Sequence, residues 1–271
     1  MCRSIDAGGR RCLHHEDLRT HDLKDLEPDA TENAPHVDWG NVPTAEELYD
    51  EFGPTVAGTA IHDLERIAKA EPAITAAVID AMPDGCRMHG LEYRMKSPRS
   101  LAAKIQKKLD ADPSRSPRTI SASLSDFIRY TVVAPHASDV VPAAHATINT
   151  LIERGWTLKE LEHSYVNGNP YKGLHSIVLE NSTGQDVEIQ FHAEDGIAIK
   201  DQFHVEYEVA RDPHTPRARR VEAHQTMVDA WSTVITPGGL QNLTIGGVSV
   251  QPKSYPAPRG PAAREQPGPG A

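Results

Sequence analysis

Cysteine and long apolar segments are scarce in this sequence of 271 residues. Three cysteines cannot build a disulfide framework, and the group Cys2, Cys12, His14 and His15 fits no common spacing of zinc ligands. The apolar runs are only a few residues long, too short to cross a bilayer, and the N-terminus lacks the apolar stretch of a secretory signal. We therefore expect a cytoplasmic protein with reduced thiols and no membrane partner.

Positive charge is also in short supply, since 28 Lys and Arg residues against 38 Asp and Glu residues give a formal net charge of −10. This balance argues against a broad basic surface for nucleic acid. A local cleft can still concentrate cations, whatever the total charge. An anionic substrate would have to be bound by a small set of placed cations.

The composition divides the chain into three parts. Residues 1–43 are polar without sustained periodicity and are expected to form a flexible arm, and residues 237–271 form a Pro- and Gly-rich tail. Residues 44–236 carry the regular patterns of one domain. Helices are expected over 44–81, 98–109, 141–154 and 198–211, and strands over 86–96, 127–133, 156–166, 174–179 and 187–192. This order predicts an α/β or α+β fold, with a mixed β-sheet of about five strands flanked by helices.

A first group of polar residues surrounds the Ser97-Pro98 turn, which suits the start of a helix. Strand residues two apart share a face, and helix residues four apart share another. The turn therefore brings together a set of phosphate donors at a helix N-terminus: Arg94, Lys96, Ser100 and Lys104. A solvated basic face would contain the same residue types, as Lys107 and Lys108 on the same helix illustrate.

A second group lies in the turn-rich segment 167–175 and on the strand that follows. The segment offers an aromatic ring at Tyr171, a cation at Lys172 and an imidazole at His175. On the strand, Glu188 and Gln190 share the face opposite the apolar residues. Either feature alone is more often ordinary packing or a half-exposed strand.

Together and in this order, the residues resemble the synthetase domain of RelA/SpoT proteins, especially the small alarmone synthetases and their toxin relatives. The resemblance runs from about Arg94 to Arg211, less than half of the chain. It implies a nucleotidyltransferase-like synthetase fold. It also implies that the ATP phosphates are bound by the family's Arg-x-Lys, Ser and Lys, here Arg94, Lys96, Ser100 and Lys104.

The resemblance extends to the acceptor half of the site. The family's loop Asn-Gly-Tyr-Arg-Ser-Leu-His corresponds to 169–175 with three substitutions. It implies that Tyr171 stacks on the acceptor base. The other implied acceptor residues are Asn169, Lys172, His175 and Gln190. Glu188 corresponds to the catalytic carboxylate and would activate the acceptor hydroxyl, bind Mg²⁺, or do both.

One position departs from the family pattern. The family's magnesium aspartate lies five residues before an arginine that begins a strand, and here that position holds Leu124. Asp126, three residues before Arg129, is the nearest aspartate. We assign Asp126 with Glu188 to Mg²⁺ and Arg129 to ATP. A helix cap or a salt bridge is the alternative for Asp126.

The implied activity is that of a GTP diphosphokinase, which transfers the β,γ-pyrophosphate of ATP to the 3′-hydroxyl of GTP or GDP. His62-Asp63 is a lone pair with too little sequence before it for the family's hydrolase domain, so we expect synthetase activity only. Toxin relatives modify adenine nucleotides or the 3′ end of tRNA, and the basic run Arg211–Arg220 would be the contact for tRNA. An antitoxin and a homo-oligomer are further partners that the resemblance allows. A nucleotide-binding sensor without catalysis is the other alternative.

Overall fold

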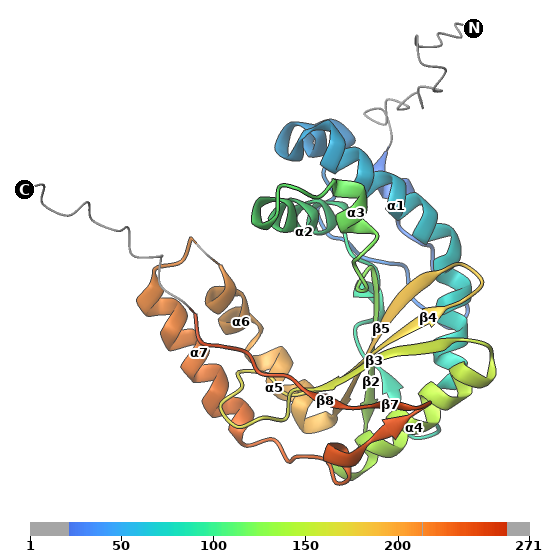
Figure 1. Cartoon of the computed structure of the whole chain (residues 1–271), viewed down its shortest axis with the longest axis vertical. Coiled ribbons are helices and arrows are strands. Elements are labelled where there is room, and N and C mark those ends of the chain that lie inside the picture. The colour runs from blue at the N-terminus through green and yellow to red at the C-terminus, as the bar shows by residue number, and fades with distance from the viewer. Residues whose placement is uncertain (1–21, 213, 259–271) are drawn as a thin grey trace, which may run out of the picture.

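The structure, a computed structural model, describes residues 22–212 and 214–258 (Figure 1). The cysteines and histidines considered for zinc, Cys2, Cys12, His14 and His15, lie outside these ranges. Within them, no helix is apolar and long enough to cross a membrane.

A six-stranded mixed sheet forms the centre of the fold. Its strand order is β1-β2-β5-β4-β3-β8. The neighbours β2/β5 and β3/β8 are parallel, and the other pairs are antiparallel. The bounds are Arg87–Met88 (β1), Ile128–Ala134 (β2), Thr157–His163 (β3), Leu174–Glu180 (β4), Gln185–Ala193 (β5) and Gln251–Pro252 (β8). The predicted mixed α/β fold is confirmed, and the hairpin expected over 174–192 is β4–β5.

Helices surround the sheet. They are α1 (Ala45–Ala81), α2 (Pro98–Ala111), α3 (Pro117–Ser121), α4 (Ala137–Glu153), α5 (Glu194–Gln202), α6 (His204–Arg211) and α7 (Arg217–Ser232). The starts of the first two follow the sequence signals. Thr44 and Glu47 form a capping box at α1, and Ser97 caps α2 with Pro98 in its first turn. Inside α1, Gly53 has φ 75°, a left-handed conformation that interrupts the helix at little cost for glycine.

The sheet has one apolar face and one polar face. Alternate residues of β2 and β5, such as Tyr130, Val132 and Ile189, are buried in the core that α1 and α4 also enter. The hydroxyl of Tyr130 lies 2.6 Å from Thr75 Oγ1 of α1. The other face is left for polar residues, and in Figure 1 α2 and α3 stand at one end of it and α5 to α7 at the other.

Both predicted ends of the chain are more ordered than their composition indicated. Within 22–43, Leu23 and Val37 are buried in the core, and Trp39 Nε1 donates to the carbonyl of Met95 at 2.9 Å. Within 237–258, Leu240 and Ile245 are buried as well. The expectation of a flexible arm and tail is therefore corrected for these stretches, because a few well-spaced apolar residues anchor each of them.

Candidate active site

Two rows of side chains cross the polar face of the sheet. Strand pairing places Glu160, Ile177, Glu188 and Arg129 side by side on β3, β4, β5 and β2. The adjacent row, in the same strand order, is Glu162, His175, Gln190 and Thr131. Glu188 is therefore the direct neighbour of Arg129, whose charge helps to keep its carboxylate ionised.

A cavity of about 220 Å³ opens on these rows. Asp126 and Glu188 both line it, although 62 positions separate them in the sequence. The other charged or titratable residues that line it are Lys104, Glu160, Glu162, His175 and Lys253. The fold thus brings the two carboxylates of the predicted metal site to one cavity.

Asp126 is held by two of the predicted phosphate-binding lysines. Its Oδ2 lies 2.5 Å from Lys104 Nζ and 3.2 Å from Lys96 Nζ. Burial favours the neutral acid, but the two ammonium groups outweigh it and lower the pKa of Asp126. Its buried Oδ1 has no hydrogen-bond partner among the described residues. An ionised carboxylate with one open oxygen is a suitable ligand for a hard cation.

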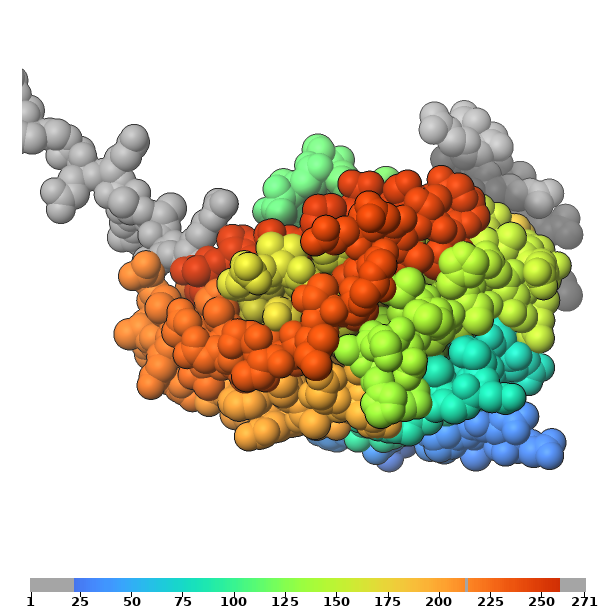
Figure 2. All heavy atoms as spheres, turned by 90° about the horizontal axis from the view of Figure 1, so that it is seen from below, coloured from blue at the N-terminus to red at the C-terminus, as the bar shows by residue number. Residues whose placement is uncertain are grey.

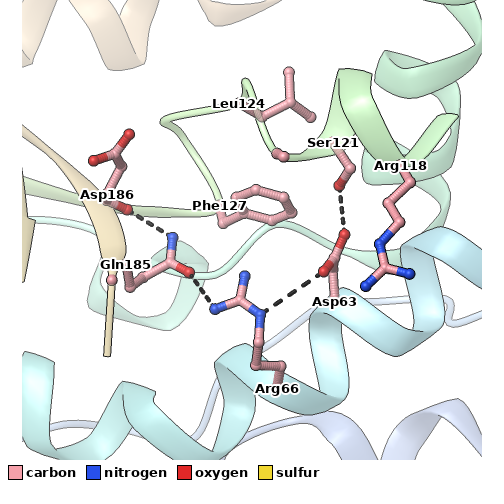
Figure 3. A pocket seen from close by; sticks show the side chains of 10 residues that line it. Asp63, Arg66, Arg118, Ser121, Leu124, Phe127, Gln185 and Asp186 are labelled. Atoms are coloured by element: carbon pink, nitrogen blue, oxygen red, sulfur yellow. Dashed lines mark hydrogen bonds and ion pairs between the residues drawn. The ribbon is translucent and has the colours of Figure 1, made fainter. Parts of the chain in front are cut away.

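The loop between α3 and β2 lines this cavity and also a second one, which Figure 3 shows. Leu124 and Phe127 line the second cavity, whereas Ser125 and Asp126 line the first. The second cavity, also about 220 Å³, contains Arg66 of α1, which bonds Gln185 and lies near Asp63. Leu124, which stands where the family pattern expects an aspartate, thus turns away from the candidate site, and Asp126 faces it.

The predicted placement of Arg94 is wrong. The strand expected over 86–96 ends at Met88, and Arg94 adopts a helical conformation after a 3-10 turn over Leu91–Tyr93. Its side chain is 1% exposed and forms a buried ion pair with Glu71 of α1. Its Nη1 also donates to the carbonyls of Pro35 and Leu91. Arg94 and Lys96 therefore do not share a face, and of the two only Lys96 reaches Asp126.

Ser100 is exposed at the start of α2, where Ser97 Oγ donates to its hydroxyl at 3.0 Å. Lys104 lies one turn further along α2 and enters the cavity. Ser100 and Lys104 thus lie one turn apart on α2, but Ser100 is not among the described residues that line the cavity.

Glu188 is strongly held as an anion. Its Oε1 accepts from Gln190 Nε2 at 2.9 Å and lies 3.2 Å from His175 Nδ1. Burial raises the pKa of Glu188, but the hydrogen bond and charge of His175, together with Arg129 and Gln190, lower it to about 2. A group of this pKa is ionised throughout the physiological pH range.

A chain of hydrogen bonds leads from Glu188 into the interior. The hydroxyl of Tyr171 lies 2.8 Å from His175 Nε2 and 2.8 Å from His192 Nε2. His175 joins the two groups, because its Nδ1 faces Glu188 and its Nε2 faces the Tyr171 hydroxyl. His192 continues the chain through its Nε2, while its buried Nδ1 has no partner among the described residues.

The ring of Tyr171 is packed edge-on against four other aromatic rings. These belong to His175, His192, Trp231 and Tyr255, with centroids 5.1 to 6.3 Å away. Tyr171 therefore belongs to an aromatic cluster beside the cavity, and its stacking on a base stays a prediction.

Two residues of the predicted acceptor loop bind the backbone instead. The ammonium of Lys172 is directed at the carbonyl of Val234, 3.5 Å away, and its residue is buried. The side-chain amide of Asn169 donates to the carbonyls of Ser164 and Lys253 and accepts from the N–H of Tyr255. Neither is among the described residues that line the cavity. Their assignment to direct nucleotide contact has no support from these contacts.

Two cations at or near the cavity, Lys253 and Lys200, were not predicted from the sequence. Lys253 lines the cavity from a Pro-rich segment that no periodic pattern marks. Lys200 of α5 interacts electrostatically with Glu188 and Arg129, and burial together with Arg129 lowers its pKa to about 8.

No family model and no curated relative matches the sequence. Solved structures do match. The fold resembles small alarmone synthetases. Small alarmone synthetase 1 from Bacillus subtilis matches at 13% identity and a TM-score of 0.37, over 64% of this chain and 87% of that one. A GTP pyrophosphokinase family protein from Streptococcus pneumoniae matches at 16% identity and a TM-score of 0.36, over 69% and 87%. The Bacillus subtilis enzyme bound to its product pppGpp matches at 14% identity and a TM-score of 0.35, over 69% and 92%.

Proposed function

We infer that this chain is a nucleotide pyrophosphokinase, which transfers the β,γ-pyrophosphate of ATP to the 3′-hydroxyl of GTP or GDP. The observation that carries this inference is the shared cavity of Asp126 and Glu188, with Lys104 at its edge and Lys96 bound to Asp126. Paired carboxylates beside placed lysines suit a reaction between two polyphosphates, because catalysis of such transfers is mostly positioning and charge neutralisation.

The donor half of the site lies where α2 meets the start of β2. Lys96 and Lys104 converge on Asp126 there, and Arg129 projects from the polar face of β2. These three cations would bind the ATP phosphates, with Ser100 adding a hydroxyl at the N-terminus of α2. Arg94 contributes by fixing the segment that carries Lys96.

Mg²⁺ fits the carboxylates present. Within the described residues no group of three acidic, His or Cys side chains is close enough to hold a metal on its own. Magnesium in phosphate-transfer sites needs only one or two carboxylates, the rest of its ligands being substrate oxygens and water. The open Oδ1 of Asp126 and the ionised Glu188 would hold it. When bound, the ion would neutralise charge on the transferred phosphates.

The transfer itself forms a bond between the 3′-oxygen of the acceptor and the β-phosphorus of ATP. The bond from that phosphorus to the α–β bridging oxygen breaks, and AMP leaves with this oxygen. Glu188 would orient the acceptor hydroxyl and receive its proton, with His175 as the next group in the chain. Since a pKa of about 2 makes Glu188 a weak base at neutral pH, orientation and metal binding are its larger contributions.

The contacts of the basic run favour a free nucleotide over tRNA. Arg219 forms ion pairs with Glu206 at 2.8 Å and with Glu222 at 3.4 Å. Arg211 bonds the hydroxyl of Tyr207 and lies over its ring. The two ion pairs of Arg219 leave less positive charge for a nucleic acid backbone, whereas the uncharged Tyr207 leaves the charge of Arg211 in place.

The direct test is AMP release from Mg²⁺-ATP with GDP, GTP, ATP or deacylated tRNA as the acceptor. We expect release with GDP or GTP and its loss in Glu188→Ala. Release with only ATP or tRNA would move the assignment to a toxin-like activity. Nucleotide binding without AMP release in the presence of any of the four acceptors would identify a sensor.

A pH dependence of ATP binding is predicted from Lys200, whose charge interacts with that of Arg129 in the proposed donor half. Its pKa of about 8 means that it is cationic at pH 7 and loses its charge as the pH rises towards 9. We expect the Kd for ATP to rise by roughly 3- to 10-fold over this range. Lys200→Arg keeps the positive charge, so the Kd of this variant for ATP should not change between pH 7 and 9. Equal pH profiles of wild type and variant would contradict the role of Lys200. Isothermal titration calorimetry at several pH values measures both.

A further inference from the structure

The C-terminal segment reaches the candidate site from the far edge of the sheet. After α7 it forms a short hairpin of β6 (Thr244–Ile245) and β7 (Val248–Ser249), and then β8 beside β3. Gly246 in the turn has φ 53°, and a Cβ there would lie only 2.7 Å from Ile152 of α4, so the hairpin packs closely on that helix. In the space-filling view the segment, in orange-red and red, runs along the surface of the molecule (Figure 2).

Lys253, directly after β8, directs its side chain into the cavity. Its backbone N–H donates to the carbonyl of His163 at 2.8 Å, which fixes its position at the sheet edge. Its Nζ donates to Glu162 Oε2 at 2.5 Å. A lysine ammonium has three donors, so two stay available for another anion. Burial lowers the pKa of Lys253, but the bond to Glu162 and its charge raise it by more, which keeps the residue cationic.

Asn169 ties this segment to the loop that carries Tyr171. Its Nδ2 donates to the carbonyls of Ser164 and Lys253 at 2.9 and 2.8 Å, and its Oδ1 accepts from the N–H of Tyr255 at 3.0 Å. Asn169 is buried, and all of these contacts are to backbone. The ring of Tyr255 in turn lies edge-on to Tyr171, 6.3 Å between centroids. Lys253 is therefore part of the same wall as the predicted acceptor loop.

The cations of the cavity are divided between its two sides. Lys104 contacts Asp126 just before β2, whereas Lys253 follows β8, and the strand order places β5, β4 and β3 between them. Glu188 lies on β5, between the two lysines. Two polyphosphate substrates repel each other, so a site that holds both at once needs separate cations for each.

We propose that Lys253 binds a phosphate of the acceptor nucleotide and that Asn169 positions Lys253 by clamping the segment around it. This assignment rests on the proposed function and completes it, because the acceptor half of the site then has a cation that does not also serve ATP. Lys253 is a substrate-binding residue in this scheme, and Asn169 acts only through it.

The test compares Lys253→Met with Lys253→Arg and with a matched control, Lys159→Met. Lys159 on β3 is as exposed as Lys253, at 43%, and is likewise ion-paired, to Asp186, but it is not among the described residues that line the cavity. We expect Lys253→Met to raise the KM for GDP by roughly 10- to 100-fold with little change in the KM for ATP. Lys253→Arg should have a KM for GDP close to that of the wild type, and Lys159→Met should behave as wild type.

The role of Asn169 is tested by a double-mutant cycle. Asn169→Ala should raise the KM for GDP, and combining it with Lys253→Met should add little, because both changes remove the same contact. Fully additive effects would show that Asn169 does not act through Lys253.

Failure of this proposal and failure of the proposed function give different results. An active Lys253→Met enzyme with an unchanged KM for GDP would overturn the proposal but not the proposed function. An equal rise of the KM for GDP in Lys159→Met would have the same meaning. If the wild type modifies no acceptor, the proposed function fails. The Kd for GDP, measured by calorimetry, then tests the role of Lys253. Equal Kd values for wild type and Lys253→Met would overturn its role, and a Kd raised only in Lys253→Met would support it.

Discussion

Glu188→Gln is expected to lower the rate of AMP release by about 1,000-fold while leaving ATP binding within a few-fold of the wild type. The substitution keeps the shape of the side chain and its bond to Gln190. It removes the negative charge that faces His175 and Arg129 and that would hold Mg²⁺ and the acceptor hydroxyl. Single-turnover measurement of AMP at saturating ATP separates this loss from any change in affinity.

The matched control for Glu188→Gln is Glu160→Gln. Glu160 occupies the same row of the sheet two strands away and lines the same cavity. We expect less than a roughly tenfold change in rate, since it lies on the far side of Ile177 from Asp126 and Arg129. Equal losses in the two variants would mean that the net charge of the cavity, and not Glu188 itself, controls the rate.

Arg94→Ala is expected to lower the free energy of unfolding by about 3–5 kcal/mol, the range measured for breaking a buried ion pair. Arg94 and Glu71 are 1% and 0% exposed, so the variant leaves the Glu71 carboxylate buried without its cation. Thr75 also donates to this carboxylate and continues the network to Tyr130. The substitution therefore disturbs contacts from α1 to the central strand β2. Urea unfolding measures the change in the free energy of unfolding.

Lys96→Ala provides the contrast to Arg94→Ala. Lys96 is 20% exposed and contacts Asp126 in the donor half of the site, so we expect little change in unfolding and a weaker affinity for ATP. The reverse result, with a stable Arg94→Ala variant that binds ATP poorly, would return Arg94 to the phosphate-binding set. The pair of variants therefore distinguishes a structural from a substrate-binding arginine.

Local sequence signals predicted most of the regular elements. The Thr44–Glu47 capping box, the Ser97-Pro98 helix start and the alternation of β5 are each set by neighbours within a few residues. The packing of residues 22–43 and 237–258 was missed because it depends on isolated apolar residues, such as Val37 and Ile245, that meet a distant part of the chain. Isolated apolar residues form no periodic pattern, so the sequence does not indicate that they are buried.

The candidate site shows the same division. Residue type and spacing marked Lys104 and Glu188, whereas Asp126 was chosen as the aspartate nearest to the expected position, and all three line one cavity. Arg94 does not lie where an extended strand over 86–96 would place it, because the chain turns after Gly90, whose φ of 65° is left-handed. The sequence did not indicate Lys253, because its position depends on the pairing of β8 with β3, in which Gln251 lies beside Glu162, 89 positions earlier.

Pyrophosphate transfer is measured most directly with ATP that carries ³²P at the β-phosphorus and with GDP as the acceptor. We expect the label to move to the acceptor in a 1:1 ratio with the AMP released, and label at the α-phosphorus to stay in AMP. We also expect Glu188→Gln to lower the rates of label transfer and of AMP release together, by about 1,000-fold. Transfer of the γ-phosphate alone, or release of the label as free phosphate or pyrophosphate without a modified acceptor, would contradict pyrophosphate transfer to the acceptor.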